Sequence, residues 1–401
     1  MIDLDFVRSQ FPALASGFVY LENAGGSQTL ARVADRIRDY LLTTNVQLGA
    51  TYPASEAATA RVREAARATA AFIGAGDPET VVLGPSTTQL LGNLALAMQG
   101  SFTPGDEIIV SSADHAANLG CWRRLEARGV VVKTWHIDRD SWRLEPSALL
   151  PLLTDRTRLV ALTHVSNVLG TIHDVAAIAR LVHDHGARTC VDGVAYAPHR
   201  EVAVEAWDVD YYVFSFYKVF GPHMAVLYGK RECLEALDTI NHEFVHELPY
   251  RLQPGNLNFE LAHGLGGIYE YIDELGARSP GTGAPKTRAF AAIAEHEERL
   301  AATMLDWLAA RPGVRIHGER SAQRARRVAT ISFTVDGRSA ESIVREVDRR
   351  GIGIRHGDFY AKELVHALGV EATGGVVRVS MVHYNSVAEL ECLFEVLDWA
   401  L

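Results

Sequence analysis

Between residues 80 and 230, short apolar and β-branched runs alternate with stretches whose apolar positions recur at helical spacing. The pattern predicts strands at residues 80–83, 107–111, 130–136, 159–164, 188–192, 211–215 and 225–228, and helices at 87–99 and 119–128. Several of these runs are continuously apolar, which is typical of strands that are buried on both faces. We therefore expect an α/β fold with a mostly parallel sheet and helices on both faces. Ligands of such sheets bind at the carboxyl ends of the strands.

The pattern changes after a helix predicted at residues 261–275, because residues 279–286 are rich in Gly and Pro and predict a surface loop. Beyond the loop, helices are expected at 289–311, 340–350 and 386–401, strands at 314–317, 329–335 and 376–381, and an extended segment at 352–355. This order predicts a smaller α+β domain. We expect a large domain over residues 15–262 and a small domain formed by residues 1–14 and 263–401.

Composition excludes several classes of protein. The chain has 401 residues, 48% of them hydrophobic and 22% charged, which is ordinary for a globular protein. The formal charge of −10 and the lack of a basic run argue against a nucleic-acid partner. No apolar run reaches the roughly 18–20 residues of a membrane span, and the N-terminal stretch does not resemble a signal peptide. We expect a cytoplasmic protein.

The four cysteines, Cys121, Cys190, Cys233 and Cys392, are widely spaced and form no CxxC or His/Cys cluster. This spacing favours neither a metal site nor a disulfide framework. We expect all four to be small core residues in a reduced protein.

Candidate chemistry lies at the ends of two predicted strands. Asp192 ends the strand at 188–192, and Lys218 follows shortly after Ser215, the last residue of the strand at 211–215. Both side chains can therefore reach one crevice. An enzyme that uses pyridoxal 5′-phosphate (PLP) needs a lysine to bond the aldehyde and a carboxylate against the pyridine nitrogen. The plainer interpretation is a carboxylate that caps a strand and a solvated lysine in a loop.

The whole chain resembles the class V aminotransferases of PLP fold type I, and within them the cysteine desulfurase-like branch. The matching segments are YLENAGGSQTL, LGPSTTQLLGNLALAM, SSADHAANLGCW, THVSNVLGTIHDV, VDGVAYAPH, FSFYKVFGPHMAVLYG, RLQPGNLNFE and VVRVSMVHYN. The resemblance implies PLP as cofactor, a small amino acid as substrate and a homodimer with shared active sites.

The resemblance also implies roles for single residues. The cofactor-binding residues would be Lys218, Asp192, His115, Thr87, Thr88, Asn167, Ser215, Tyr217 and Asn256, of which Lys218, His115 and Asp192 would be catalytic. His115 would stack on the pyridine ring, and the Thr87–Thr88 pair would present a helix N-terminus to the phosphate. Asn256 would reach a phosphate across the dimer interface. A capping histidine and an ordinary helix N-cap are the alternatives for the first two assignments.

For the substrate, the resemblance implies that Arg378 grips the α-carboxylate, a task that suits its planar fork of donors. Asn167 would contact both the cofactor and that carboxylate. The alternatives are a structural arginine and an asparagine that forms a turn.

The chain also departs from the family pattern. Tyr217 stands where the desulfurases usually have histidine, and Ala195 replaces a glutamine. In IRHGDFYA, Tyr360 occupies the position of the nucleophilic cysteine. Tyr360 would then line the substrate pocket as an acid or a cover, or simply pack. A desulfurase that forms a persulfide is therefore not expected.

The expected reaction is β-elimination with C–S bond cleavage of cysteine or an S-substituted cysteine. Transamination and epimerisation by the same site are the alternatives, since each begins at a bond to Cα. A scaffold without catalysis is the remaining alternative.

Overall fold

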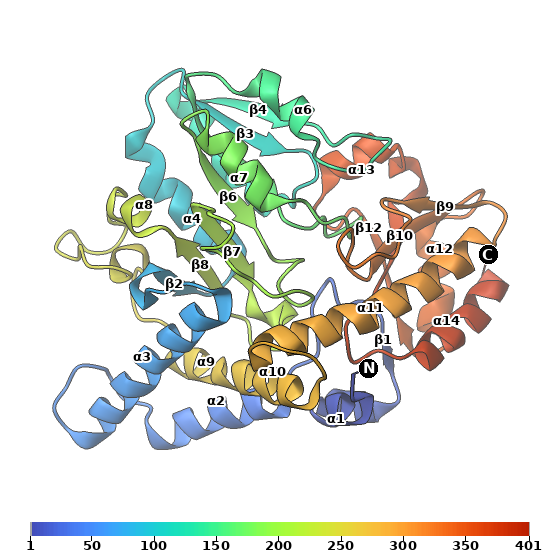
Figure 1. Ribbon diagram of the computed structural model, residues 1–401, viewed down its shortest axis with the longest axis horizontal. Helices are drawn as coiled ribbons and strands as arrows, with labels where there is room; N and C mark the ends of the chain where they lie inside the picture. Colours follow the sequence, from blue (N-terminus) through green and yellow to red (C-terminus); the bar gives the residue numbers. More distant parts are fainter. Residues whose placement is uncertain (1, 401) are drawn as a thin grey trace.

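A computed structural model describes residues 2–400, and it has two parts bridged by one long helix (Figure 1). The larger part contains a seven-stranded sheet in the order β2-β8-β7-β6-β5-β3-β4. Its strands are β2 (Val81–Gly84), β3 (Glu107–Ser111), β4 (Val131–Trp135), β5 (Thr157–Thr163), β6 (Arg188–Asp192), β7 (Tyr211–Ser215) and β8 (Ala225–Gly229). Strands β4, β3, β5, β6 and β7 pair in parallel, whereas β8 pairs antiparallel with both of its neighbours. The expected mostly parallel sheet is confirmed.

The side chains of this sheet enter two separate hydrophobic clusters, one on each face. In β7, Tyr212 and Phe214 belong to one cluster, while Tyr211 and Val213 belong to the other. Helices α4 (Thr87–Met98) and α5 (Ala117–Arg123) contribute to the second cluster, and α7 (Val175–His183) and α10 (Gly266–Arg278) contribute to the first. The continuous apolar runs of the sequence therefore follow from burial on both faces.

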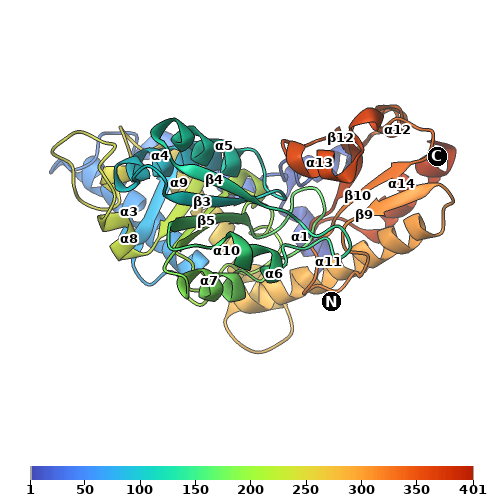
Figure 2. The same cartoon turned by 90° about the horizontal axis from the view of Figure 1, so that it is seen from above.

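The smaller part contains a four-stranded antiparallel sheet in the order β12-β13-β10-β9. Its strands are β9 (Val314–His317), β10 (Thr330–Val335), β12 (Arg355–Gly357) and β13 (Val376–Ser380). A third hydrophobic cluster joins this sheet to α11 (Pro285–Ala309), α12 (Ala340–Asp348) and α14 (Val387–Ala400). Figure 2 shows α11 running beneath both parts. The smaller part has the expected α+β character.

The N-terminal segment also contacts the smaller part. Strand β1 (Val19–Tyr20) pairs in parallel with β11 (Ile352–Gly353). The chain therefore passes along the smaller part before it enters the larger sheet. The domain boundaries after residues 14 and 262 stay a prediction.

Several helices differ from the expected ones. The expected helix at 261–275 is two helices, α9 (Phe259–Gly264) and α10, with Leu265 between them. Helix α11 begins at Pro285, inside the expected loop, because proline is well suited to the first turn of a helix. No element is expected over residues 31–73, where the chain forms α2 (Ala31–Thr43) and α3 (Pro53–Ile73).

The remaining elements are short. The α-helices are α1 (Leu4–Ser9), α6 (Pro146–Leu149), α8 (Arg231–Glu235) and α13 (Lys362–Leu368). The 3-10 segments are η1 (Pro12–Ser16), η2 (Pro78–Thr80), η3 (Gln99–Ser101), η4 (Arg124–Arg128), η5 (Leu150–Leu152), η6 (Phe216–Lys218), η7 (Tyr250–Leu252) and η8 (Glu371–Thr373). Within residues 2–400, none of the helices combines the length and the apolar character that a bilayer crossing requires.

The contact between α10 and α11 depends on a glycine. A Cβ atom at Gly276 would overlap the backbone of Pro285, whereas a Cβ at Gly120 in α5 would meet open space. We predict that Gly276→Ala lowers the free energy of unfolding by about 1–3 kcal/mol, since the backbone has to shift. Gly120→Ala is the matched control and should be neutral or stabilising by up to about 1 kcal/mol. Urea unfolding followed by circular dichroism measures both, and equal effects would contradict the prediction.

Candidate active site

A cavity of about 70 Å³ lies at the carboxyl ends of β5, β6 and β7, beside the N-terminus of α4. Eight of the residues selected from the sequence line it: Thr87, Thr88, His115, Asn167, Asp192, Ser215, Tyr217 and Lys218. Neighbouring parallel strands end at the same edge of a sheet, so residues distant in the sequence meet there. The structure thus brings most of the expected site together.

Lys218 and Asp192 are both buried in this cavity. Burial lowers the pKa of Lys218 to about 8, and the positive charge of Arg378 acts in the same direction. Burial raises the pKa of Asp192 to about 6, against a hydrogen bond of 2.9 Å from the backbone N–H of Val194 and the charge of Lys218. A side chain at Gly193 would overlap the ring of Tyr212, so the turn after Asp192 requires glycine. At neutral pH this pair is a carboxylate facing an ammonium.

Hydroxyl groups meet where α4 begins. The backbone N–H of Thr87 donates to Oγ of Ser215 over 3.1 Å, and Oγ1 of Thr87 lies 2.7 Å from the same atom. Ser86 caps the helix by accepting a hydrogen bond from the N–H of Gln89. A helix N-terminus together with these hydroxyls forms a site suited to a phosphate group.

His115 follows β3 and faces the cavity as a neutral ring. Its Nδ1 accepts a hydrogen bond of 3.0 Å from the N–H of Ala117. Burial lowers the pKa of His115 to about 4, and the charges of Lys218 and Arg378 act in the same direction. A flat, uncharged ring in this place can stack on an aromatic group.

Asp114, next to His115, is a fully buried carboxyl group that the sequence patterns did not single out. Its side chain accepts hydrogen bonds from Ser111 and, over 2.8 Å, from Asn118. Burial raises its pKa to about 8, and the negative charge of Asp192 acts in the same direction. Asp114 is therefore protonated at neutral pH.

Arg378 on β13 lies behind Asn167 and is shielded from solvent. Its Nη1 donates to the backbone oxygen of Asn167 over 3.0 Å, and its guanidinium carbon lies 3.7 Å from the centre of the Phe359 ring. The Asn167 side chain donates to the backbone oxygen of Phe359 over 3.0 Å. The Oδ1 atom of Asn167 and Nε of Arg378 are buried without a hydrogen-bond partner. Each of the two residues therefore retains one polar atom that is available to a ligand.

Tyr360, by contrast, has 64% of its surface exposed. Its ring centre lies 5.3 Å from that of His115, and its backbone oxygen accepts a hydrogen bond of 2.7 Å from Ala116. Phe359 and Tyr360 have φ angles of 52° and 59°, which are costly for residues other than glycine. Such strain is often kept where a loop must present its groups to a site. The loop thus contacts two residues that line the cavity, His115 and Asn167.

Glu22 is a site residue that the sequence patterns missed. Its Oε1 lies 3.2 Å from Nη2 of Arg378 and 3.4 Å from Nη1 of Arg355. A Cβ at Gly25 would overlap the Glu22 carboxylate, so this glycine makes room for it. The only signal in the sequence was the position of Glu22 inside YLENAGG, since its partner is 356 residues away.

Asn256 lies elsewhere in the chain. It lines a separate cavity of about 680 Å³ with residues of α3, and its side chain pairs with Gln47. The phosphate contact expected of Asn256 across a dimer stays a prediction.

The expectation for the cysteines needs one correction. Cys121, Cys190 and Cys233 are buried, but Cys392 is exposed. Helix α14 turns Leu390, Leu393 and Leu397 toward the core, and this leaves Cys392 on the outer face. None of the four cysteines lines the cavity of Lys218.

A buried lysine and a buried carboxylate at neighbouring strand ends, beside a helix N-terminus, define the site of a cofactor-dependent enzyme. The chain belongs to the aminotransferase class-V family, which it matches over residues 19–393.

The chain is similar to proteins of several organisms. "Aminotransferase-like protein FGM3" of Gibberella zeae is 42% identical, with 99% of this chain and 98% of the relative covered. "Cysteine desulfurase-like protein ustD" of Aspergillus flavus is 34% identical, with 99% and 90% covered. The crystal structure of the cysteine desulfurase CsdA from Escherichia coli superposes with a TM-score of 0.86 at 29% identity and covers 100% of this chain and 98% of that one. These relatives confirm the family and the PLP fold type I architecture.

Enzymes of this family use PLP. The cavity residues fit this cofactor. Lys218 supplies a buried amine, Asp192 a buried carboxylate, and Thr87 and Ser215 a cluster of hydroxyls. The buried Oδ1 atom of Asn167 has no hydrogen-bond partner within the protein, so it is available to a ligand.

The two buried carboxyl groups predict how stability changes with pH. The pKa of Asp114 is raised from 3.8 to about 8, so between these values the folded chain holds a proton that the unfolded chain lacks. Its contribution to stability is full below pH 3.8 and is lost as the pH rises through about 8. One such proton corresponds to about 1.4 kcal/mol per pH unit. Other groups also titrate between pH 6 and 8, among them Lys218, whose pKa is lowered to about 8, and buried histidines such as His173, which gain a proton only in the unfolded chain. The contribution of Asp114 is therefore measured as the difference between a variant and the unaltered protein.

We predict that Asp114→Asn removes this contribution, so the slope of the unfolding free energy against pH between pH 6 and 8 is more positive in the variant than in the unaltered protein. Asparagine imitates the neutral acid but does not titrate. Asp138→Asn is the control, because backbone N–H groups hold the pKa of Asp138 below its usual value, outside this window. Urea unfolding at pH 6, 7 and 8 measures the slopes. Parallel slopes for Asp114→Asn and the unaltered protein would refute the assignment.

Proposed function

We propose that this enzyme acts on a small L-amino acid and breaks the C–S bond of cysteine or an S-substituted cysteine by β-elimination. The observation that supports this most is the pairing of Lys218 and Asp192 in one buried cavity that no cysteine lines. The names of its relatives point the same way, since several of them are cysteine desulfurases. For cysteine itself, the overall change would be cysteine and water to pyruvate, ammonia and hydrogen sulfide.

The surroundings of each residue indicate its proposed role in this reaction. PLP, when bound, accepts the electrons that a breaking bond leaves at the substrate Cα. Asp192 would hold a proton at the pyridine nitrogen, and the neutral ring of His115 would stack on the cofactor. Thr87, Thr88, Ser215 and Tyr217 would bind the phosphate. Lys218 would hold the cofactor and then move the α-proton, for which a pKa of about 8 is well placed.

Arg378 and Asn167 bind the substrate carboxylate in this proposal. Arg378 is charged at every physiological pH, although burial lowers its pKa to about 10. Its unpartnered Nε is a donor that a carboxylate oxygen would satisfy. The free Oδ1 of Asn167 is an acceptor, so Asn167 would bind the carboxylate through its side-chain N–H group, which here donates to Phe359.

The sulfur product would leave without being taken up by the enzyme. A persulfide needs a thiolate beside the substrate, and Tyr360 stands in that place. Its phenol lies at the mouth of the cavity, beside His115. Tyr360 therefore covers the substrate and takes no sulfur.

We also propose a homodimer. Asn256 and α3 border a wide cavity that a second chain would complete, and this would bring Asn256 to the phosphate of the partner's cofactor. Sedimentation of the purified protein at its working concentration tests the dimer.

The covalent link to Lys218 can be tested by colour. We predict that Lys218→Ala removes both the visible absorption that borohydride bleaches in the unaltered enzyme and at least about 1,000-fold of the turnover, because bonding to the cofactor and proton transfer are both lost. Lys362→Ala, at an exposed residue of α13, is the matched control and should keep both. A Lys218→Ala variant with full activity would refute the proposal.

The reaction can be tested by its products. Incubation with cysteine or S-methylcysteine should yield pyruvate and a thiol or sulfide in equal amounts. Accumulated pyridoxamine phosphate would indicate transamination instead, and an inverted Cα without a keto acid would indicate epimerisation. No pyruvate from any cysteine derivative would overturn β-elimination.

A further inference from the structure

Arg378 is closed off by the protein itself. Only 2% of its side chain is exposed, although it is the arginine that the proposed function gives to the substrate carboxylate. The Phe359 ring covers one face of the guanidinium, and the backbone oxygen of Asn167 accepts a hydrogen bond from Nη1. The remaining edge, at Nη2, faces Glu22. A substrate carboxylate therefore meets an arginine whose outer edge already has a partner.

That partner, Glu22, carries the same chemical group as the proposed ligand, a carboxylate. Glu22 presents a carboxylate oxygen 3.2 Å from Nη2 of Arg378, which is the contact that an amino-acid carboxylate would make. The same oxygen lies 3.4 Å from Arg355, which stands opposite Arg378 in the β12–β13 register. About a third of the Glu22 side chain is exposed, so it can turn toward solvent when a ligand arrives.

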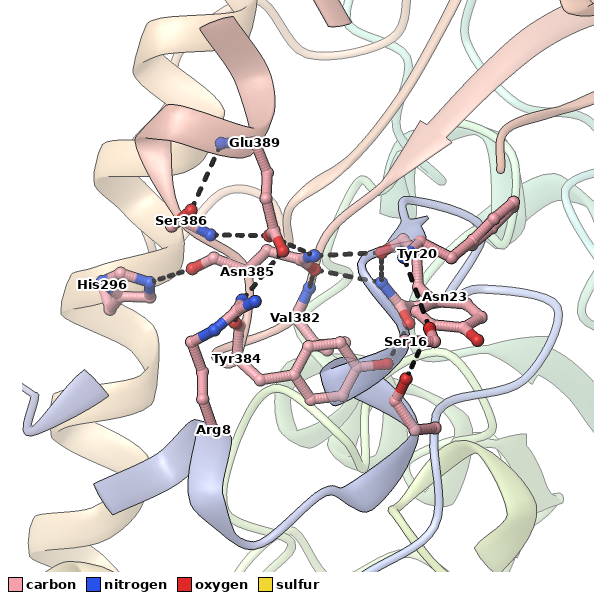
Figure 3. Close-up of polar contacts among 12 residues, drawn as sticks. Arg8, Ser16, Tyr20, Asn23, His296, Val382, Tyr384, Asn385, Ser386 and Glu389 are labelled. Atoms are coloured by element: carbon pink, nitrogen blue, oxygen red, sulfur yellow. Dashed lines mark hydrogen bonds and ion pairs between the residues drawn. The ribbon is translucent and has the colours of Figure 1, made fainter. Parts of the chain in front are cut away.

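The backbone of Glu22 is nevertheless held firmly. Glu22 bridges to Ser380 on the same strand as Arg378. The next residue, Asn23, donates its side-chain N–H groups to the oxygens of Tyr20, Ser380 and Asn385 over 2.9–3.1 Å. Figure 3 shows Asn23 at one side of the network, hydrogen-bonded to Tyr20 and Asn385. These contacts fix the backbone position of Glu22, so that only its side chain can move.

We propose that Glu22 is a specificity-determining residue whose carboxylate competes with the substrate carboxylate for Arg378. This inference rests on the proposed role of Arg378. Removing the charge of Glu22 frees the Nη2 edge of Arg378 and abolishes the repulsion between two carboxylates, and both effects strengthen binding of an anionic ligand. Binding of an uncharged analogue should not change.

The test uses the PLP-loaded enzyme and two ligands without an amine, 3-mercaptopropionate and its uncharged amide, 3-mercaptopropionamide. Calorimetric titration measures their affinities directly, without turnover. We expect Glu22→Gln to bind 3-mercaptopropionate about five- to tenfold more tightly than the unaltered enzyme, since solvent screens part of the charge. The affinity for the amide should stay the same. Glu22→Ala is a second variant, and it should also tighten binding of the acid.

Two further variants separate the possible failures. Glu389→Gln is the matched control, because Glu389 pairs with Arg8 over 2.8 Å in the network of Figure 3, and its loss should leave both affinities unchanged. Arg378→Lys should weaken binding of the acid at least about tenfold. If Arg378→Lys has no effect, the proposed role of Arg378 fails. If Arg378→Lys weakens binding but both Glu22 variants bind the acid no more tightly, or if the amide also tightens, the inference about Glu22 is wrong.

Discussion

The mutual attraction of Asp192 and Lys218 inside a buried cavity is the interaction on which the site depends. Each group lies at the end of a strand in the middle of the large sheet, and each would lose its charge if it were buried alone. Burial raises the pKa of Asp192 to about 6 and lowers that of Lys218 to about 8, and the charge of each opposes the change in the other. The window between these values is where both charges coexist. Strands β6 and β7 are parallel, so their carboxyl ends lie at the same edge of the sheet, and this brings Asp192 and Lys218 together.

The sequence predicts this edge well, for a physical reason. Strands buried on both faces leave continuous apolar runs, and the polar residue that follows such a run lies at the sheet edge. Asp192, Ser215 and Lys218 could therefore be placed from the pattern alone. The resemblance to a family added His115 and Asn167, and both line the same cavity.

The contacts between the N-terminal segment and the smaller part could not be predicted in this way. Glu22 and Arg378 are 356 residues apart, and no local period connects them. Asp114 was missed because a buried acid next to a histidine has no pattern of its own. Of the two helices at 31–73, α3 is rich in alanine and its apolar stripe is weak, whereas α2 has a clear amphipathic pattern that does predict a helix. Cys392 was misplaced because a cysteine in an amphipathic helix can face either side, and only the packing of α14 decides which.

Three carboxyl groups near the cavity illustrate how surroundings assign roles to one kind of side chain. Asp114 is fully buried beside another acid and has neutral hydrogen-bond partners, so it keeps its proton and serves to hold the turn before His115. Asp192 is equally buried, but it faces Lys218 and accepts a backbone N–H, so it is charged at neutral pH and can hold a proton on a ring nitrogen. Glu22 lies at the exposed edge between two arginines, where a carboxylate can be exchanged for another. The difference among the three is depth and partner, and this difference underlies the structural role of Asp114 and the roles proposed for Asp192 and Glu22.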